Sequence, residues 1–306
     1  MKPLELVGLP PLMERTAGSP AVTVGLIDGS VALDHPDLAG HPVRELRPAR
    51  QGGPGRGRCG PKDACCAHGT FVAGILSARR TSVAPAICPH CTLLTRPIFS
   101  GGPYAGSGGP GPAPGPACMS GARTEELAAA VVETVAAGAQ VINLSLAQAE
   151  PSGRRHRELD EALDHAARHG VIIVVAAGNQ GTLGISSITR HPWTIPVVAC
   201  DRGGRPLRLS NLGGSIGRRG LGAPGDGIVS LGIDGRALTL SGTSAAAPFV
   251  TGTIALLRSE FPAASAAEVR FAVTHSAAVR GRGSVTPPLL DAWAAYRLLL
   301  AAHARG

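Results

Sequence analysis

Short apolar runs alternate with amphipathic segments along most of this chain. The first run, Ala21–Ile27, is rich in β-branched residues and ends at the acidic Asp28, which is typical of a strand buried on both faces of a sheet. Similar runs follow at Thr92–Leu94, Val141–Leu146, Val171–Ala176 and Ile195–Ala199. Segments with helical spacing occur at His68–Arg79, Thr124–Ala137, His156–His169 and Thr243–Glu260. This alternation predicts an α/β fold with a doubly wound, mostly parallel sheet and helices on both faces.

The same pattern divides the chain into an arm and one large domain. Residues 1–20 contain several prolines and no clear periodicity, so we expect an irregular N-terminal arm on the surface. Residues 21–303 carry the alternating pattern, and their length suits a single domain. A segment at about 100–120 is dominated by glycine and proline. We expect it to be a mobile surface loop within that domain, because it has too few apolar residues to pack as a core.

Composition and charge restrict the partners. No apolar run in the 306 residues reaches the roughly 18 needed to span a membrane. The start of the chain lacks the apolar run of a secretory signal, so we expect a cytoplasmic protein with no membrane association. The net charge is +8 and comes almost entirely from arginine. Because no arginine cluster is interleaved with aromatic residues, we attribute this charge to a general surface bias and expect no nucleic-acid partner.

The chain has an odd number of cysteines. They are Cys59, Cys65, Cys66, Cys88, Cys91, Cys118 and Cys200. Two residues separate Cys88 from Cys91, a spacing found in reduced thiol pairs, in local disulfides and in half zinc sites. In the third case, Cys59, Cys65 or Cys66 would supply further ligands. No second CxxC motif follows at zinc-ribbon spacing, which favours plain thiols, but the spacing leaves all three interpretations open.

Ser244 lies in a turn of small residues that opens the longest helical run. A nucleophilic serine needs a tight turn that exposes its hydroxyl, and the N–H groups at the start of the following helix can face developing negative charge. Taken alone, the string also fits an ordinary helix cap. Asp28 at a predicted strand end and His68 at a predicted helix start precede the serine. The order Asp, His, Ser is that of one class of serine hydrolases.

Six blocks, in order and at plausible spacings, make this chain resemble the subtilisin-like serine proteases, or subtilases. They are Gly25–Gly29, Asp34–Leu38, His68–Gly74, Val141–Leu146, Ala176–Asn179 and Gly242–Ser244. The resemblance covers residues 21–300 approximately. It implies the subtilisin-like three-layer α/β/α fold and a serine endopeptidase activity that needs no cofactor.

The resemblance also implies the roles of four catalytic residues. Ser244 would attack the peptide carbonyl, His68 would move the proton, and Asp28 would orient the imidazole and stabilise its cation. Asn179 matches the oxyanion residue of the family, whose side-chain amide would donate to the tetrahedral intermediate.

Five further residues match positions that bind substrate in the family. Ser145 and Leu146 match the strand that pairs with an extended peptide and forms one wall of the P1 pocket, and Gly178 precedes the oxyanion residue. Trp193 stands where the family usually has glycine or alanine, and Arg190 lies near the expected base of the pocket. We expect Trp193 to narrow the pocket and Arg190 to favour an acidic P1 side chain. The alternative is a shifted loop in which both side chains point to solvent.

The chain departs from the family in two respects. Asp28 comes so early that no inhibitory propeptide fits before it, and we expect the enzyme to fold unaided or to be controlled through substrate access. The segment between His68 and Ala84 is shorter than in the calcium-binding members. Although Asp37 matches one calcium ligand, we therefore expect no calcium and no other metal site.

Finer details are similar to one subgroup, the proteases that trim precursor peptides in cyanobactin-type biosynthesis. These details are Val31 close after Asp28, the pair Ile87–Cys88 followed by Pro97–Phe99, and the absence of a prodomain and signal. One alternative is a generic intracellular subtilase. Another, from a different class, is a subtilase-fold protein that binds a peptide without cutting it. In each case the expected partner is a peptide or protein, and the sequence leaves the oligomeric state open.

Overall fold

The structure is a computed structural model that describes residues 1–46, 59–60, 63–99, 123–145, 156–184, 186–276 and 284–304. The glycine- and proline-rich segment at about 100–120 and the candidate substrate-binding residue Leu146 lie outside these ranges. Among the described residues, no helix has an apolar stretch long enough to cross a membrane.

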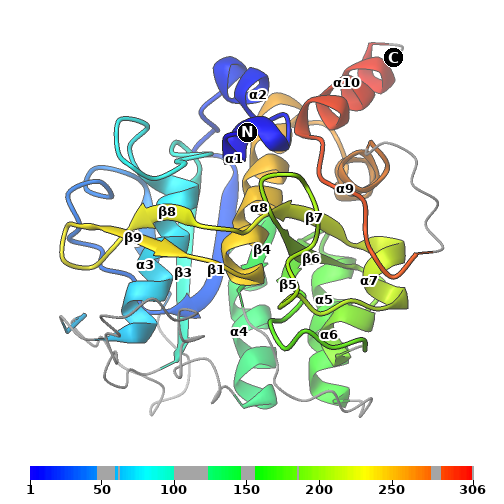
Figure 1. Cartoon of the computed structure of the whole chain (residues 1–306), viewed down its shortest axis with the longest axis horizontal. Helices are drawn as coiled ribbons and strands as arrows, with labels where there is room; N and C mark the ends of the chain where they lie inside the picture. Colours follow the sequence, from blue (N-terminus) through cyan, green and yellow to red (C-terminus); the bar gives the residue numbers. More distant parts are fainter. Residues whose placement is uncertain are drawn as a thin grey trace.

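Seven strands form one parallel sheet through the centre of the molecule (Figure 1). In spatial order they are β2 (Val43–Glu45), β3 (Thr92–Phe99), β1 (Thr23–Gly29), β4 (Val141–Leu144), β5 (Ile172–Ala176), β6 (Thr194–Cys200) and β7 (Leu221–Pro224). Every neighbouring pair is parallel. The chain first adds strands on one side of β1 and later on the other side. Because the direction reverses beside β1, a ligand site is expected at the carboxyl ends of β1 and β4.

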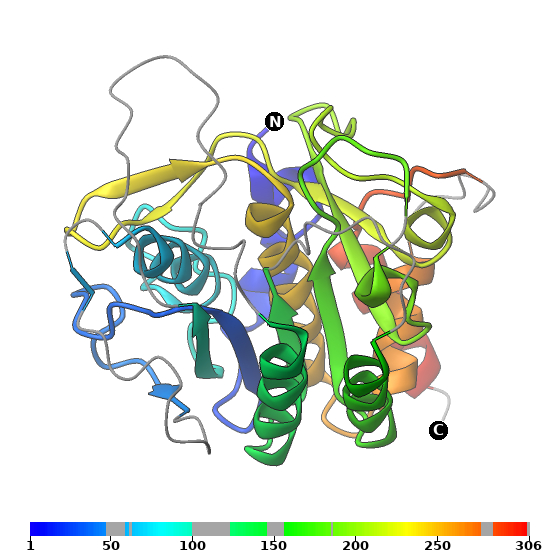
Figure 2. The ribbon, with the colours of Figure 1, turned by 90° about the horizontal axis from the view of Figure 1, so that it is seen from below.

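Helices cover both faces of this sheet, as Figure 2 shows from a second direction. The two layers pack into separate cores. One layer contains α3 (Ala64–Ser77) and α8 (Thr243–Glu260), and the other contains α4 (Thr124–Ala136) and α5 (Arg157–Arg168).

Strand residues alternate between the two cores. In β1, Leu26 packs with α3 and α8, whereas its neighbour Ile27 packs with α4 and α5. In β5, Val174 and Val175 divide in the same way. Both faces of the strands are therefore buried, which explains why their sequences are continuously apolar rather than alternating. The predicted fold class is confirmed.

Several elements have no clear signal in the sequence pattern. Strands β8 (Ile228–Leu231) and β9 (Ala237–Leu240) form a separate antiparallel pair. Short helices α6 (Ser187–Arg190) and α7 (Gly214–Arg219) flank β6, and helices α9 (Ala266–His275) and α10 (Ala292–His303) pack against each other near the end of the chain.

The N-terminal arm, residues 1–20, differs from the irregular segment that we expected. It contains two short helices, α1 (Pro3–Leu6) and α2 (Pro10–Arg15), each with proline in its first turn, where the missing N–H costs nothing. Leu9 and Leu12 are fully buried in the core that also contains α8. The arm is thus packed into the domain. The proposed boundary at residue 20 stays a prediction.

Candidate active site

Asp28 and His68 form a buried hydrogen-bonded pair at the carboxyl end of β1. Asp28 is the penultimate residue of β1, and His68 lies in the second turn of α3. His68 Nδ1 is 2.7 Å from Asp28 Oδ1, and the two side chains are only 4% and 1% exposed. Asp28 Oδ1 also accepts the Gly29 N–H, whereas Oδ2 has no hydrogen-bond partner among the described residues. Asp28 therefore holds the His68 imidazole through a single carboxylate oxygen.

Two glycines permit this close approach of α3 to β1. A Cβ on Gly69 would lie 2.4 Å from the Ser30 carbonyl oxygen, and a Cβ on Gly29 would lie 2.1 Å from the Cys65 carbonyl oxygen. Any larger residue would force the helix away from the strand. Gly29 beside Asp28 and Gly69 beside His68 therefore allow the strand and the helix to approach closely enough for the hydrogen bond between Asp28 and His68.

Ser244 is the second residue of α8 and is partly exposed. Gly242 forms the N-cap with φ of 136°, a conformation that favours glycine. Pro248 inside the helix lacks the N–H that would bond the Ser244 carbonyl four residues earlier. Ser145 Oγ instead donates to that carbonyl, at 3.4 Å. The start of α8 is therefore tied to the end of β4, where Ser145 lies.

Asn143 holds this connection in place from β4. Its side-chain amide donates to Ser145 Oγ at 2.7 Å, and its Oδ1 accepts the Thr251 hydroxyl of α8 at 2.8 Å. Both the start of α8 and its third turn are thus fixed against β4 through one buried side chain. The six blocks of the sequence included Asn143, but its function as a brace becomes apparent only from these contacts.

Asn179 lies just beyond β5 and contacts the residue before the serine. Its Oδ1 accepts the Thr243 N–H at 2.9 Å and the Thr243 hydroxyl at 3.0 Å. A backbone N–H can only donate, so the side-chain atom facing it is the oxygen and the amide nitrogen points elsewhere. The N–H of Gly178 donates to the same hydroxyl at 3.1 Å.

The orientation of Asn179 leaves a donor beside the start of α8. Asn179 is exposed, and a Cβ on Gly242 would lie 3.0 Å from its Nδ2. Glycine at that position leaves the amide uncovered. The Ser244 N–H lies in the first turn of α8, where a helix provides no internal acceptor. Two donors are thus available in the same neighbourhood, as an oxyanion site requires.

Arg190 ends α6 and lies against α5. Its guanidinium is 3.9 Å from Asp160, and its side chain is 20% exposed. The carbonyl of Arg190 accepts from Arg219 at 2.7 Å. The arginine is neither free in solvent nor alone in a pocket, because its charge is partly balanced by the carboxylate.

The structure corrects the position that we predicted for Trp193. This residue precedes β6, and its indole N–H donates at 2.8 Å to the carbonyl of Val171, which precedes β5. The strands are parallel, so Trp193 lies at their amino ends. Asn179 follows the opposite end of β5, roughly 16 Å away for a five-residue strand. Arg270 stacks on the indole at 5.2 Å and donates to the Trp193 carbonyl. Trp193 therefore does not narrow a pocket beside Ser244.

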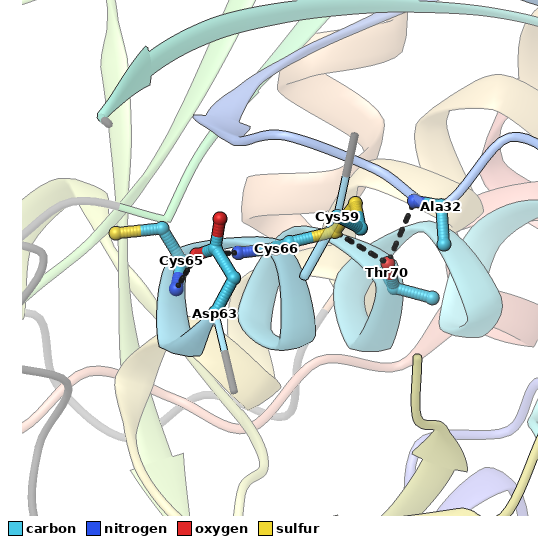
Figure 3. The surroundings of a disulfide bond; sticks show 6 residues. All are labelled: Ala32, Cys59, Asp63, Cys65, Cys66 and Thr70. Atoms are coloured by element: carbon cyan, nitrogen blue, oxygen red, sulfur yellow. Dashed lines mark hydrogen bonds between the residues drawn. A yellow bond between two sulfur atoms is a disulfide. The ribbon is translucent and has the colours of Figure 1, made fainter. Parts of the chain in front are cut away.

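The described cysteines differ in their bonding: two form a disulfide and four are thiols. Cys59 and Cys66 form a disulfide (Figure 3), a pairing that the sequence spacing had not suggested. Cys65, Cys88, Cys91 and Cys200 are buried thiols. Burial raises the pKa of Cys200 to about 12, so this thiol is unreactive. Among the described residues, no group of three His, Cys, Asp or Glu side chains is arranged to hold a metal.

The parallel sheet with helices on both faces is also the fold of the solved structures that this chain resembles. The chain belongs to the subtilase family, whose family model matches residues 19–287. Fervidolysin from Fervidobacterium pennivorans is 28% identical in an alignment 298 positions long, which covers 87% of this chain and 39% of that protein. The chain thus spans well under half of that relative.

Two solved structures are similar over nearly the whole chain. The prenylagaramide maturation protease PagA is 26% identical with a TM-score of 0.80, covering 95% of this chain and 98% of that one. The patellamide maturation protease PatA is 28% identical with a TM-score of 0.76, covering 93% and 98%.

Proposed function

We propose that this protein is a serine endopeptidase in which Asp28, His68 and Ser244 are the catalytic residues. The observation that carries the proposal is the buried 2.7 Å hydrogen bond between Asp28 and His68, at the sheet edge where α8 begins, with Ser244 as its second residue. The carboxylate holds a proton on Nδ1 of the imidazole, so Nε2 is the basic nitrogen. We assign the catalytic domain to residues 21–303.

The proposed reaction proceeds through an acyl-enzyme. Ser244 Oγ attacks the scissile carbonyl while His68 Nε2 takes its proton, and Asp28 stabilises the resulting imidazolium. The Asn179 amide and the Ser244 N–H donate to the developing oxyanion. His68 then gives the proton to the leaving amine, and water releases the acyl group by the same steps in reverse order.

An activity-based probe tests this assignment and its non-catalytic alternative. A fluorophosphonate phosphonylates only a serine whose hydroxyl is activated by a base. We expect stoichiometric labelling of the wild-type protein on Ser244 and none of Ser244→Ala. Absence of labelling of the folded wild type would favour a peptide-binding protein that does not cleave.

We further propose that the substrate is a ribosomally made precursor peptide, cut at a defined site. Similarity to PagA and PatA along 95% and 93% of this chain supports this substrate class. Ser145 and Gly178, at the ends of β4 and β5, are proposed to receive the extended substrate backbone. Recognition of this kind reads the backbone first and the side chains second.

A competition assay separates precursor processing from general proteolysis. The protein is incubated with a leader-bearing precursor peptide from the genomic neighbourhood of its own gene and with casein, and the products are identified by mass spectrometry. Cleavage of the precursor at one bond, with casein intact, is the expected result. Many cuts in both substrates would establish a generic subtilase instead.

Arg190 is proposed to favour an acidic P1 side chain. Asp160 balances part of its charge at 3.9 Å, so the preference is expected to be modest, about tenfold over alanine. A peptide library varied at P1 measures it, with Arg190→Ala as the variant and Arg157→Ala, at an exposed arginine of α5 that pairs with Glu161, as the control. A profile that is unchanged in Arg190→Ala would contradict this role.

The cytoplasmic location stays a prediction. A disulfide such as the one between Cys59 and Cys66 is more typical of oxidising compartments. Fractionation of the native cells, with immunodetection of the protein, decides between the two.

A further inference from the structure

Cys88 and Cys91 occupy the turn that leads into β3, at the amino end of the sheet. The Cys91 N–H donates to the Cys88 carbonyl at 3.0 Å, which closes a four-residue turn. The end residues of such turns have Cα atoms within about 7 Å, and disulfides typically span Cα distances of about 4.4–6.8 Å. Both residues are buried thiols. The turn therefore holds a dithiol in a geometry close to that of its disulfide.

The two thiols are chemically different. Hydrogen bonding from the Cys88 thiol lowers the pKa of Cys91, with further hydrogen bonds from the Ser19 backbone and the Ser259 hydroxyl acting in the same direction. The bond to Cys91 and complete burial raise the pKa of Cys88 well above its ordinary value. A thiol of lowered pKa beside a partner of raised pKa is the arrangement that supports thiol–disulfide exchange.

The N-terminal arm covers this dithiol. A Cβ on Gly18 would lie 2.5 Å from Cys91 Sγ and 3.6 Å from Cys88 Cβ, so the arm passes directly over both residues. Hydrogen bonds fasten the arm beside the turn: the His90 N–H donates to the Ala17 carbonyl at 3.0 Å, and the Thr92 hydroxyl donates to the Pro20 carbonyl at 2.9 Å.

We propose that Cys88 and Cys91 form a redox-modification site that exchanges with small disulfides such as glutathione disulfide, and that the N-terminal arm gates it. The site lies at the opposite end of the sheet from Asp28, His68 and Ser244. It is separate from the Cys59–Cys66 disulfide, which is already formed.

The exchange needs only the named oxidant. With the arm lifted, the Cys91 thiol loses its proton to solvent, and the resulting thiolate attacks one sulfur of glutathione disulfide. This forms a mixed disulfide and expels one glutathione thiolate, which takes up a proton. Cys88 then loses its proton to solvent and attacks Cys91 Sγ, which releases the second glutathione. Two protein thiols become one disulfide, and one glutathione disulfide becomes two thiols, so electrons and protons balance.

Oxidation and arm docking are coupled. Cys91 Sγ accepts a hydrogen bond from the Ser19 backbone, and a disulfide sulfur is a much poorer acceptor. The docked arm therefore stabilises the dithiol. By reciprocity, a variant with a displaced arm must oxidise more readily.

The test uses the full-length protein in glutathione buffers of graded redox ratio. Free thiols are trapped by alkylation, and the state of the peptide containing Cys88 and Cys91 is read by mass spectrometry. In Gly18→Ala, the added methyl group displaces the arm, and we expect the equilibrium to shift toward the disulfide by at least about fivefold. Gly138→Ala is the matched control, because Gly138 also has a positive φ, of 89°, but no atom within 4 Å of its Cβ position.

Thr92→Val provides a second variant that loosens the arm without touching either sulfur. It removes the hydrogen bond to the Pro20 carbonyl and is expected to shift the equilibrium in the same direction. If Gly18→Ala does not fold, Thr92→Val alone tests whether the arm controls oxidation of the two cysteines. Equal shifts in Gly18→Ala and Gly138→Ala would overturn the gating. Failure of both loosened variants to form the disulfide, or retention of zinc by the wild type that Cys88→Ser abolishes, would overturn the redox site itself.

Discussion

The two ends of the parallel sheet use their polar groups in opposite ways. At the carboxyl end, Asn179 is exposed and Ser244 is partly exposed, so their polar groups can reach a bound substrate. At the amino end, the side chains of Trp193 and Arg80 donate their hydrogen bonds to backbone carbonyls. The first end retains bonding capacity for a substrate, whereas the second uses it to close the fold. Substitutions at the two ends should therefore separate catalysis from stability.

Replacement of the Asp28 carboxylate by an amide should have the largest effect. In Asp28→Asn, the side chain loses the negative charge that fixes the proton on His68 Nδ1 and stabilises the imidazolium formed during the reaction. We expect kcat on a peptide substrate to fall by about 10⁴, with the thermal midpoint close to that of the wild type because the shape is retained. Steady-state kinetics and thermal unfolding measure the two quantities. An activity loss below about tenfold would remove Asp28 from the catalytic set.

Asn179→Ala should have the next largest effect. The substitution removes Nδ2 as an oxyanion donor and is expected to lower kcat by about 10² to 10³ with little change in KM. It also removes the acceptor of Thr243, so a structural loss must be distinguished from a catalytic one. Asn211→Ala is the comparison: Asn211 accepts the N–H groups of Gln180 and Thr182 in the same loop. If both variants lose activity equally, Asn179 acts through loop structure alone.

Arg80→Ala should destabilise the molecule without changing catalysis. Its guanidinium donates to the carbonyls of Met13, Thr16 and Ile87 and so fastens the N-terminal arm. We expect a loss of about 1–3 kcal/mol in the free energy of unfolding, measured by urea denaturation, with kcat within about twofold of the wild type. Arg79→Ala is the matched control, because within the described part of the chain Arg79 donates one side-chain hydrogen bond, to the Ala39 carbonyl. A large fall in kcat for Arg80→Ala would break the separation of the two ends.

The sequence predicted the parts of this molecule that depend on local pattern. Continuous apolar runs identified β1, β4 and β5, because strands buried on both faces leave such runs. The pairing of Asp28 with His68 followed from the motifs and has the expected geometry.

The errors concern relations that local pattern does not contain. Trp193 was placed by its match to a family position, but chain position does not show which end of the sheet a connecting loop reaches. The spacing of the cysteines gave no indication that Cys59 and Cys66 form a disulfide. The brace formed by Asn143 depends on Thr251, more than a hundred residues away.

Trp193→Phe should have the smallest effect and tests the corrected position of this residue. Phenylalanine retains an aromatic ring beneath Arg270 but loses the indole N–H that donates to the Val171 carbonyl. We expect a loss of about 0.5–1.5 kcal/mol in the free energy of unfolding and no change in the P1 profile. The same peptide library that tests Arg190 provides the measurement. An altered P1 preference in Trp193→Phe would show that a residue at the amino end of β6 affects substrate binding. The two ends of the sheet would then not be functionally separate.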